Sequence, residues 1–393
     1  MFLRFRAGFT TLLLALSLPI AALAQGARVP GYVGSQACAD CHTDAYANWQ
    51  TSHHGEAWCM PDAAVLQGAF AGETFELKGM SATFDTVDGL RRVFVREEDG
   101  SEATYDLHSV GGTHPLQHLI LETEAGRLQS FDVVWDVDQR RWFHLYPDQD
   151  LPPQDAFHWS GVYKNWNARC AECHATGFEK NFDFRSKSYA SRQAEIGLGC
   201  EACHGPGQAH LAFADGQPVG NWDISLDDYG FSADMSDPQV AMEQCAGCHS
   251  RREAFGNGNP LPGTKFADAY NLALLRPGLY HSDGQILDEV YVYGSFLQSK
   301  MHQNGVTCAN CHTPHSAEPL AEGNAVCTQC HSPAGNPDFP TLPLAVYDTS
   351  AHSHHDDSVE CVSCHMTDRT YMGNDPRRDH SFRVPRPDLT GAI

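Results

Sequence analysis

The sequence predicts a mainly α-helical fold with long loops, interrupted by one antiparallel β-rich insert. Helix-capping signals recur over the second half of the chain, and one stretch in the first half alternates apolar and polar residues. The 393 residues include 34 glycines and 22 prolines, which favour loops between short elements. Loops this abundant leave little apolar sequence for an ordinary core, so we expect another source of apolar interior.

The first 24 residues have the pattern of a secretory signal peptide. Arg4 and Arg6 precede the apolar run TTLLLALSLPIAALA, which ends in the small-x-small cleavage signal Ala22-Leu23-Ala24. The run is short for a membrane anchor, and no second apolar segment follows it. We therefore expect residues 1–24 to be cleaved and the mature chain to be periplasmic or otherwise exported, without an integral membrane segment.

The chain is strongly acidic. Its formal charge is −23, and loss of the two signal-peptide arginines gives −25 (−23 − 2). A surface with this charge repels nucleic-acid phosphates and anionic lipid headgroups. We therefore exclude nucleic acid as a partner; oligomeric state stays open.

Cysteine spacing carries the strongest chemical signal. Fourteen of the fifteen cysteines lie in seven C-x-x-C-H units, numbered 1 to 7 along the chain. The cysteines of these units are Cys38 and Cys41, Cys170 and Cys173, Cys200 and Cys203, Cys245 and Cys248, Cys308 and Cys311, Cys327 and Cys330, and Cys361 and Cys364. Their histidines are His42, His174, His204, His249, His312, His331 and His365. The remaining cysteine, Cys59, is expected to be a buried free thiol.

Covalent haem c explains every position of the unit better than zinc or a redox dithiol does. Zinc sites use pairs of C-x-x-C and give no reason for a histidine after each second cysteine. A thioredoxin-like pair needs a single activated thiol, not seven copies. In c-type haem the two thiols form thioethers with the porphyrin edge, and the histidine binds the iron as the proximal ligand. We therefore predict seven haem c groups, and a haem-packed fold in which the porphyrins supply the apolar interior.

The motifs are unevenly distributed and suggest three parts after the signal peptide. Residues 25–69 form an N-terminal segment with haem 1, residues 70–165 a β-rich insert without haem, and residues 166–393 a domain with haems 2–7. In the insert, FDVVWDV (131–137) has apolar residues at every second position, and Asp88-Gly89 is a hairpin-turn dipeptide. In the last part, Asp237-Pro238 predicts a helix start and Ser295–Gly305 predicts a helix.

The second axial ligand of each iron is expected to be histidine. Twenty-two histidines less the seven of the motifs leave fifteen, whereas methionines are few. The distal candidates are His53, His54, His210, His281, His302, His315, His352, His354, His355 and His380. His315 is too close to its own motif to reach the opposite face of haem 5, so we expect it to bind the iron of a neighbouring haem. Five further histidines are expected to be structural or propionate partners: His108, His114, His118, His144 and His158.

Several long strings resemble a known family. CHTDAYANWQTSHHGEA, NWNARCAECHATGFEKNFD, CEACHGPGQAH and YHSDGQILDEVYVYGSFLQSKMHQNGVTCANCHTPHS are similar to multihaem cytochromes of the cytochrome c-554 group. The resemblance is closest to periplasmic members that often carry C-terminal tetratricopeptide repeats, and this chain ends at Ile393, where such repeats would begin. The resemblance implies a helical, haem-packed domain with distal ligands at His53 or His54, His302, His315 and His380.

Three functions are compatible with this pattern. The favoured one is single-electron transfer between redox partners, either redox proteins or quinol-linked membrane donors, through closely packed and mostly bis-histidine haems. The alternative is a haem-dependent oxidoreductase of small nitrogen or sulfur compounds with one open iron, although no motif has lysine in place of its histidine. A subunit of an extracellular cytochrome filament is the third. The sequence assigns no catalytic residue.

Overall fold

The fold is described from a computed structural model, which covers residues 27–62, 65–124, 126–339, 343–356, 358–386 and 388. The predicted signal peptide at 1–24 lies outside these residues. Within the described residues, no helix is both long enough and apolar enough to pass through a bilayer.

The prediction of a mainly α fold was wrong, because 25% of the described residues are in strands and 20% are in helices. The helix signals marked real helix starts but carried no information about helix length. The Asp237 carboxylate caps α6 (Pro238–Ala246) by accepting bonds from the amides of Gln239 and Val240, yet α6 has only nine residues. The helix expected over 295–305 is two single turns, α8 (Tyr293–Phe296) and α9 (Lys300–Gln303).

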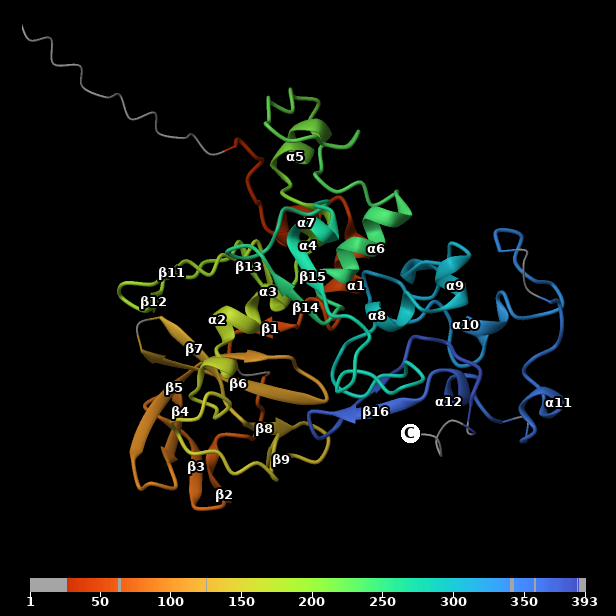
Figure 1. Ribbon diagram of the computed structural model, residues 1–393. Helices are drawn as coiled ribbons and strands as arrows, with labels where there is room; N and C mark the ends of the chain where they lie inside the picture. Colours follow the sequence, from red (N-terminus) through yellow and green to blue (C-terminus); the bar gives the residue numbers. More distant parts are fainter. Residues whose placement is uncertain are drawn as a thin grey trace, which may run out of the picture.

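A nine-stranded antiparallel sheet, nearly closed on itself, lies mainly between the first and second motifs (Figure 1). Its order is β2-β3-β4-β5-β6-β8-β9, with β1 paired to β5 and β7 paired to β6. Asp88 and Gly89 both have positive φ, 55° and 78°, as the two-residue turn between β3 and β4 requires. The strands are β1 (Trp58–Cys59), β2 (Ala71–Leu77), β3 (Met80–Val87), β4 (Leu90–Arg96), β5 (Glu102–Gly111), β6 (Leu116–Glu124), β7 (Arg127–Ser130), β8 (Val133–Asp136) and β9 (Arg141–His144).

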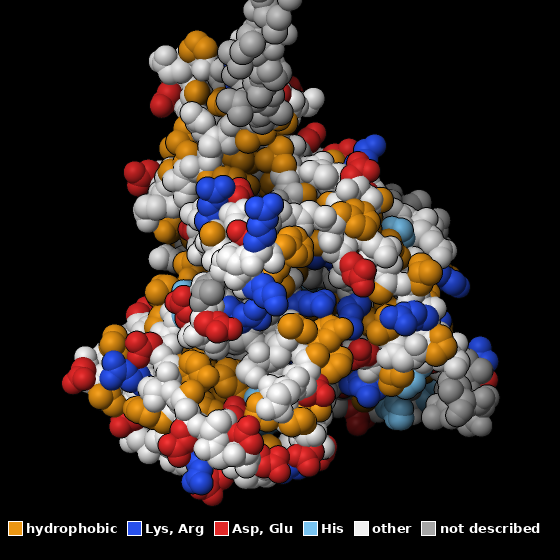
Figure 2. Space-filling view, turned by 60° about the vertical axis from the view of Figure 1, so that its left-hand side comes forward, with side chains coloured by type: hydrophobic (Ala, Val, Ile, Leu, Met, Phe, Trp, Pro, Cys, Tyr) orange, Lys and Arg blue, Asp and Glu red, His pale blue; other side chains and the backbone are white. Residues whose placement is uncertain are grey.

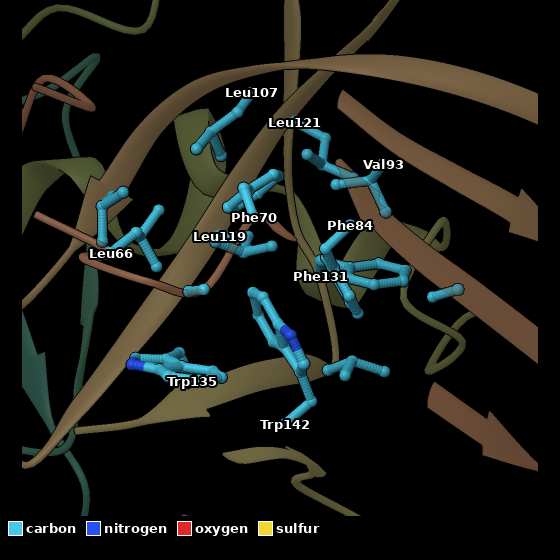
Figure 3. Close-up of a cluster of buried hydrophobic side chains, with 14 of the residues drawn as sticks. Leu66, Phe70, Phe84, Val93, Leu107, Leu119, Leu121, Phe131, Trp135 and Trp142 are labelled. Atoms are coloured by element: carbon cyan, nitrogen blue, oxygen red, sulfur yellow. The ribbon is translucent and has the colours of Figure 1, made fainter. Parts of the chain in front are cut away.

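The inner face of this sheet encloses an aromatic core (Figure 3). The rings of Phe84 and Trp142 are stacked with centroids 3.6 Å apart, and Phe131 meets Phe84 edge-on. Phe84 and Phe131 are fully buried. The sheet therefore has a conventional apolar core that needs no porphyrin.

Replacing Phe84 by alanine should lower the free energy of unfolding by about 3–5 kcal/mol, because it leaves a cavity among buried rings. The matched control is Phe94→Ala on the neighbouring strand, where the side chain is 37% exposed and the change should cost roughly 0.5 kcal/mol. Urea denaturation of the haem-loaded protein, followed by far-UV circular dichroism, measures both. Equal losses in the two variants would contradict this account of the core.

The remaining residues form short helices and two-stranded ribbons joined by long loops. The 3-10 helices are η1 (Ser35–Cys38), η2 (Val162–Lys164) and η3 (Cys308–Asn310). Besides α6, α8 and α9, the α-helices are α1 (Thr43–Gln50), α2 (Trp166–Arg169), α3 (Ala171–His174), α4 (Cys200–His204), α5 (Gln208–Ala214), α7 (Phe266–Ala269), α10 (Ala325–Thr328), α11 (Ser350–Ser353) and α12 (Val362–His365). The ribbons are β10 (Ala175–Thr176) with β13 (Glu195–Ile196), β11 (Phe182–Asp183) with β12 (Ser188–Tyr189), β14 (Arg252–Ala254) with β15 (Tyr270–Leu272), and β16 (Asp368–Tyr371) with β17 (Asp375–Arg378).

The C-terminal ribbon returns to the sheet. Figure 1 shows β16 lying beside β8 and β9, although a long stretch of sequence separates β16 from these two strands. Met372, in the turn between β16 and β17, packs on the cluster that contains Leu116 and Leu145. Gly373 lies so close to Phe143 that an added Cβ would be 2.6 Å from the ring. The ribbon that follows the last motif therefore packs directly on the sheet.

Candidate functional site

Each C-x-x-C-H unit is held by a local turn of backbone. In five of the units the histidine amide donates to the carbonyl of the first cysteine, which puts these two side chains on one face of the turn. The bonds join His42 to Cys38 (2.9 Å), His249 to Cys245 (2.9 Å), His312 to Cys308 (3.0 Å), His331 to Cys327 (2.9 Å) and His365 to Cys361 (3.0 Å). The units at Cys170 and Cys200 lie on α3 and α4. Each unit can therefore present two sulfurs and one imidazole to the same ligand.

Five motif histidines face a second histidine at nearly the same distance. Two imidazoles bound to opposite sides of one iron, each through a bond of about 2 Å, have ring centroids about 6.3 Å apart. The observed centroid distances are 6.1 Å for His42 and His210, 6.1 Å for His249 and His54, 6.4 Å for His204 and His315, 6.3 Å for His312 and His380, and 6.1 Å for His365 and His352. The spaces between these rings fit bis-histidine haem iron.

The hydrogen bonds of these histidines select the form that binds metal. When Nδ1 donates to a backbone carbonyl, Nε2 keeps its lone pair for the iron. The bonds run from His54 to Pro314 (3.2 Å), His174 to Ala57 (2.8 Å), His210 to Tyr229 (2.9 Å), His365 to Arg383 (2.9 Å) and His380 to Arg378 (3.0 Å). Burial also favours neutral rings; it lowers the pKa of His249 to about 4, with the nearby His54 acting in the same direction.

The other distal candidates are not paired in this way. His53, His281, His354 and His355 are exposed. His302 is half-buried, with its ring 5.5 Å from that of Phe296. Among the residues that the structure describes, no histidine ring faces His174 or His331 at the distance of the five pairs. Their ring neighbours are Trp166, 5.0 Å from His174, and Tyr347, 5.9 Å from His331.

Most histidines of the sheet have partners of their own. His114 pairs with Asp138 at 3.0 Å, and His158 lies 3.4 Å from Glu97. The Nδ1 atom of His108 is 2.8 Å from the Ser109 hydroxyl, and that of His144 accepts from the Tyr146 amide at 3.0 Å. His118 hydrogen-bonds the Phe131 backbone and interacts with His174, while its buried Nε2 has no hydrogen-bond partner among the described residues. The apolar string LQHLIL, in which His118 lies, did not predict an unpartnered buried nitrogen.

Sulfurs of different motifs lie next to one another. Hydrogen bonds join the thiols of Cys38 and Cys200, Cys173 and Cys248, Cys245 and Cys308, and Cys327 and Cys361. Electrostatic interactions that raise thiol pKa values also link Cys203 to Cys245 and Cys248, and Cys330 to Cys311. These contacts connect all seven motifs into one network, in the order 1–3–4–5–6–7 with motif 2 attached to motif 4.

Glu201, the second residue of motif 3, is a buried group that the sequence analysis missed. Its side chain is 1% exposed, and its carboxylate accepts from the amides of Val33 and Gly34 just before motif 1. The same carboxylate accepts from the Gly207 amide at 2.7 Å. An acidic residue inside a C-x-x-C-H unit is the only sequence signal for this role. Glu201 fixes the first motif to the third.

Repeated covalent attachment motifs with facing histidines define a multihaem c-type cytochrome. Residues 37–69 and 155–205 match the family described as cytochrome c554 and c-prime. These two segments of the chain are therefore similar to multihaem cytochromes of the c554 type, a family whose haem c is bound covalently.

Two solved structures are similar to the chain. The outer cell wall cytochrome OcwA has 19% identity and a TM-score of 0.58, over 92% of this chain and 81% of that one, which shows a shared fold. The octaheme sulfite reductase MccA of Wolinella succinogenes (form II) has 16% identity and a TM-score of 0.38, over 92% of this chain and 60% of that one, a likeness too weak to carry an argument. Comparison with curated proteins gives no match.

Proposed function

We propose that the chain binds seven haem c groups and passes single electrons along them between redox partners outside the cytoplasm. The observation that carries the proposal is the set of five histidine pairs with centroids 6.1–6.4 Å apart. A six-coordinate iron of this kind binds no substrate and changes only its oxidation state. The chain's own residues attach the porphyrins, hold the imidazoles and exclude water; bound haem supplies the electron chemistry.

The contacts between motifs support an electron path through the protein. In the haem-loaded protein the paired sulfurs would be thioethers, so the cysteines that would hold neighbouring haems are close together. The path runs from haem 1 through haems 3, 4, 5 and 6 to haem 7, with haem 2 as a branch at haem 4. Haems 1 and 7 are then the points at which redox proteins or quinol-linked donors exchange electrons.

The remaining assignments extend the same proposal. His54, His210, His315, His352 and His380 are the distal ligands of haems 4, 1, 3, 7 and 5, and His315 thus binds the iron of a haem other than its own. The parts at 25–69, 70–165 and 166–393 act as an N-terminal haem segment, a haem-free β unit and the main haem domain. Cleavage after residue 24 and export give the compartment in which haem c is attached.

The haem count can be measured by intact mass of the protein purified from a host with haem c maturation. We expect a mass that exceeds the mature polypeptide by seven haem groups. The double variant Cys308→Ser and Cys311→Ser should carry one group fewer, because both thioethers of haem 5 are lost. A wild-type count below seven would contradict the proposal.

A second function, an oxidoreductase of small nitrogen or sulfur compounds, is favoured by one observation. His331 of motif 6 has Tyr347 as its ring neighbour, at 5.9 Å, and no facing histidine among the described residues, although five other motifs have one. An enzyme of this class needs such an open iron. A titration of the ferric, haem-loaded protein with nitrite, followed by optical and EPR spectra, tests this candidate, and a protein with only low-spin haem would contradict it.

A further inference from the structure

One face of β6 lies against motif 2. Side chains of a strand alternate between its two faces, so His118 and Ile120 share a face. Ile120 belongs to an apolar cluster with Ala171, and Cys170 packs against that cluster. Ser130, the cross-strand partner of Ile120, has its hydroxyl oxygen 3.9 Å from the Cys170 sulfur. The face of β6 that carries His118 is therefore next to a sulfur that would hold haem 2.

A second set of contacts connects His118 to the proximal histidine of the same motif. Gly111 on β5 is the cross-strand partner of His118, and a Cβ added to Gly111 would be 3.7 Å from the His118 Cβ. The same added Cβ would be 2.8 Å from Cη2 of Trp166. The Trp166 ring in turn lies 5.0 Å from the ring of His174. His118 and His174 therefore both lie around the Trp166 ring.

The hydrogen bonds of His118 follow the pattern of the proposed ligand histidines. Its ring bonds the Phe131 backbone, and since its Nε2 has no partner among the described residues, Nδ1 is the bonded atom. The Phe131 amide donates to the Leu119 carbonyl at 3.0 Å, which holds this segment beside β6. His174 is held in the same way, because its Nδ1 donates to the Ala57 carbonyl at 2.8 Å. Each ring therefore keeps the lone pair of Nε2 for a metal.

A free Nε2 of this kind does not suit the propionate role expected from the sequence. A propionate carboxylate accepts hydrogen bonds, whereas the Nε2 of a neutral ring with its proton on Nδ1 is itself an acceptor. Burial lowers the pKa of His118 to about 4, against the opposing effect of the bond to Phe131, so the ring is neutral at pH 7. A buried acceptor without a partner is destabilising, and bound iron would satisfy it.

His118 is separate from the charged surface of this region. Figure 2 shows Lys and Arg side chains gathered across the middle of one face, above the sheet. These cations are in contact with solvent, whereas the Nε2 atom of His118 is buried. Bulk water therefore does not supply the partner that Nε2 lacks.

We propose that His118 is the distal ligand of haem 2, so that the sheet supplies an axial ligand although its strands contain no attachment motif. His118 is not among the histidines that face a motif histidine at 6.1–6.4 Å. The support comes instead from the shared face of β6, the contacts through Gly111 and Trp166, and the free Nε2. This inference rests on the proposed function, which attaches haem 2 at Cys170 and Cys173. An axial imidazole also sets the potential of its iron, so the sheet would tune the branch haem.

The first test is His118→Ala in the ferric, haem-loaded protein, measured by EPR, near-infrared magnetic circular dichroism and intact mass. We expect the haem count of the wild type, because Cys170, Cys173 and His174 are unchanged, but one bis-histidine haem fewer per chain. Added imidazole should restore that haem to the low-spin state, which separates loss of a ligand from loss of the fold. The matched control is His108→Ala on β5, where Nδ1 lies 2.8 Å from the Ser109 hydroxyl; it should leave the bis-histidine count unchanged.

Two further variants locate the effect at haem 2. His118→Met keeps an apolar side chain that can bind iron, so one haem should change from His/His to His/Met ligation. The double variant Cys170→Ser and Cys173→Ser removes both thioethers of haem 2. Adding His118→Ala to this double variant should cause no further spectral change.

Three results would overturn the inference. The first is an unchanged number of bis-histidine haems in both His118→Ala and His118→Met, in proteins whose mass shows seven haems. The second is a further loss when His118→Ala is added to the double cysteine variant, which would place His118 at another haem. The third is an equal loss in His108→Ala. A wild-type mass below seven haems would instead count against the proposed function, so the two failures are distinguishable.

Discussion

Replacing His54 by alanine should convert one low-spin haem to high-spin and impair electron passage through the whole protein. The His54 ring lies 6.1 Å from that of His249, the distance expected across one iron. Motif 4 also contacts motifs 2, 3 and 5 through its two cysteines. Loss of an axial imidazole shifts the potential of haem 4, and each 59 mV changes the one-electron equilibrium with its neighbours about tenfold. Loss of the distal ligand of haem 4 should therefore slow electron transfer through the protein more than loss of the distal ligand of haem 1 or haem 7.

The adjacent residue is the matched control. His53 is exposed and faces no described histidine, so His53→Ala should leave the spectrum and the electron transfer unchanged. EPR of the ferric proteins reports the spin state. Stopped-flow reduction by dithionite reports how quickly the haems equilibrate. Equal behaviour of the two variants would refute the assignment of His54 to haem 4.

Replacing Glu201 by alanine should destabilise the protein by about 3–5 kcal/mol, because it leaves one buried and two partly buried backbone donors without an acceptor. The carboxylate accepts from Val33 at 2.9 Å and from Gly34 and Gly207 at 2.7 Å each. These amides lie on two separate loops next to motifs 1 and 3. We also expect a lower fraction of molecules with haem 1 attached, since the loop before Cys38 loses its anchor.

Two further variants test whether burial of the Glu201 carboxylate causes the loss of stability. Glu201→Gln keeps one acceptor oxygen and should lose less stability, about 1–3 kcal/mol. Glu360→Ala, at an exposed position directly before motif 7, should be nearly neutral. Thermal unfolding and intact mass give the stability and the haem occupancy. A loss of stability in Glu360→Ala as large as that in Glu201→Ala would contradict this role of Glu201.

The sequence could predict only those groups of site residues that lie close together along the chain. The C-x-x-C-H units need only a short turn, so their residues are adjacent in both sequence and structure. The Asp88-Gly89 turn is equally local. Among the ten distal candidates, five lie opposite a motif histidine, yet nothing in the sequence shows that His54 faces His249 or that His210 faces His42. Those pairings depend on long-range packing.

The fold class was predicted wrongly for a related reason. Capping residues such as Asp237 identify where a helix begins, but a helix of nine residues and one of twenty begin alike. Most of the described helices here have four or five residues, because each serves one motif or one loop. His118 was predicted to be a structural or propionate partner; its position beside His174 of motif 2 could not be predicted, because contacts between the sheet and motif 2 have no local sequence signal.

We propose that the facing histidines bind the haem irons in pairs. Near-infrared magnetic circular dichroism of the ferric, haem-loaded protein tests it most directly, because the charge-transfer band distinguishes His/His from His/Met ligation. We predict at least five bis-histidine haems per chain, one for each observed pair. Fewer than five, in a protein with its full complement of haem, would contradict the account.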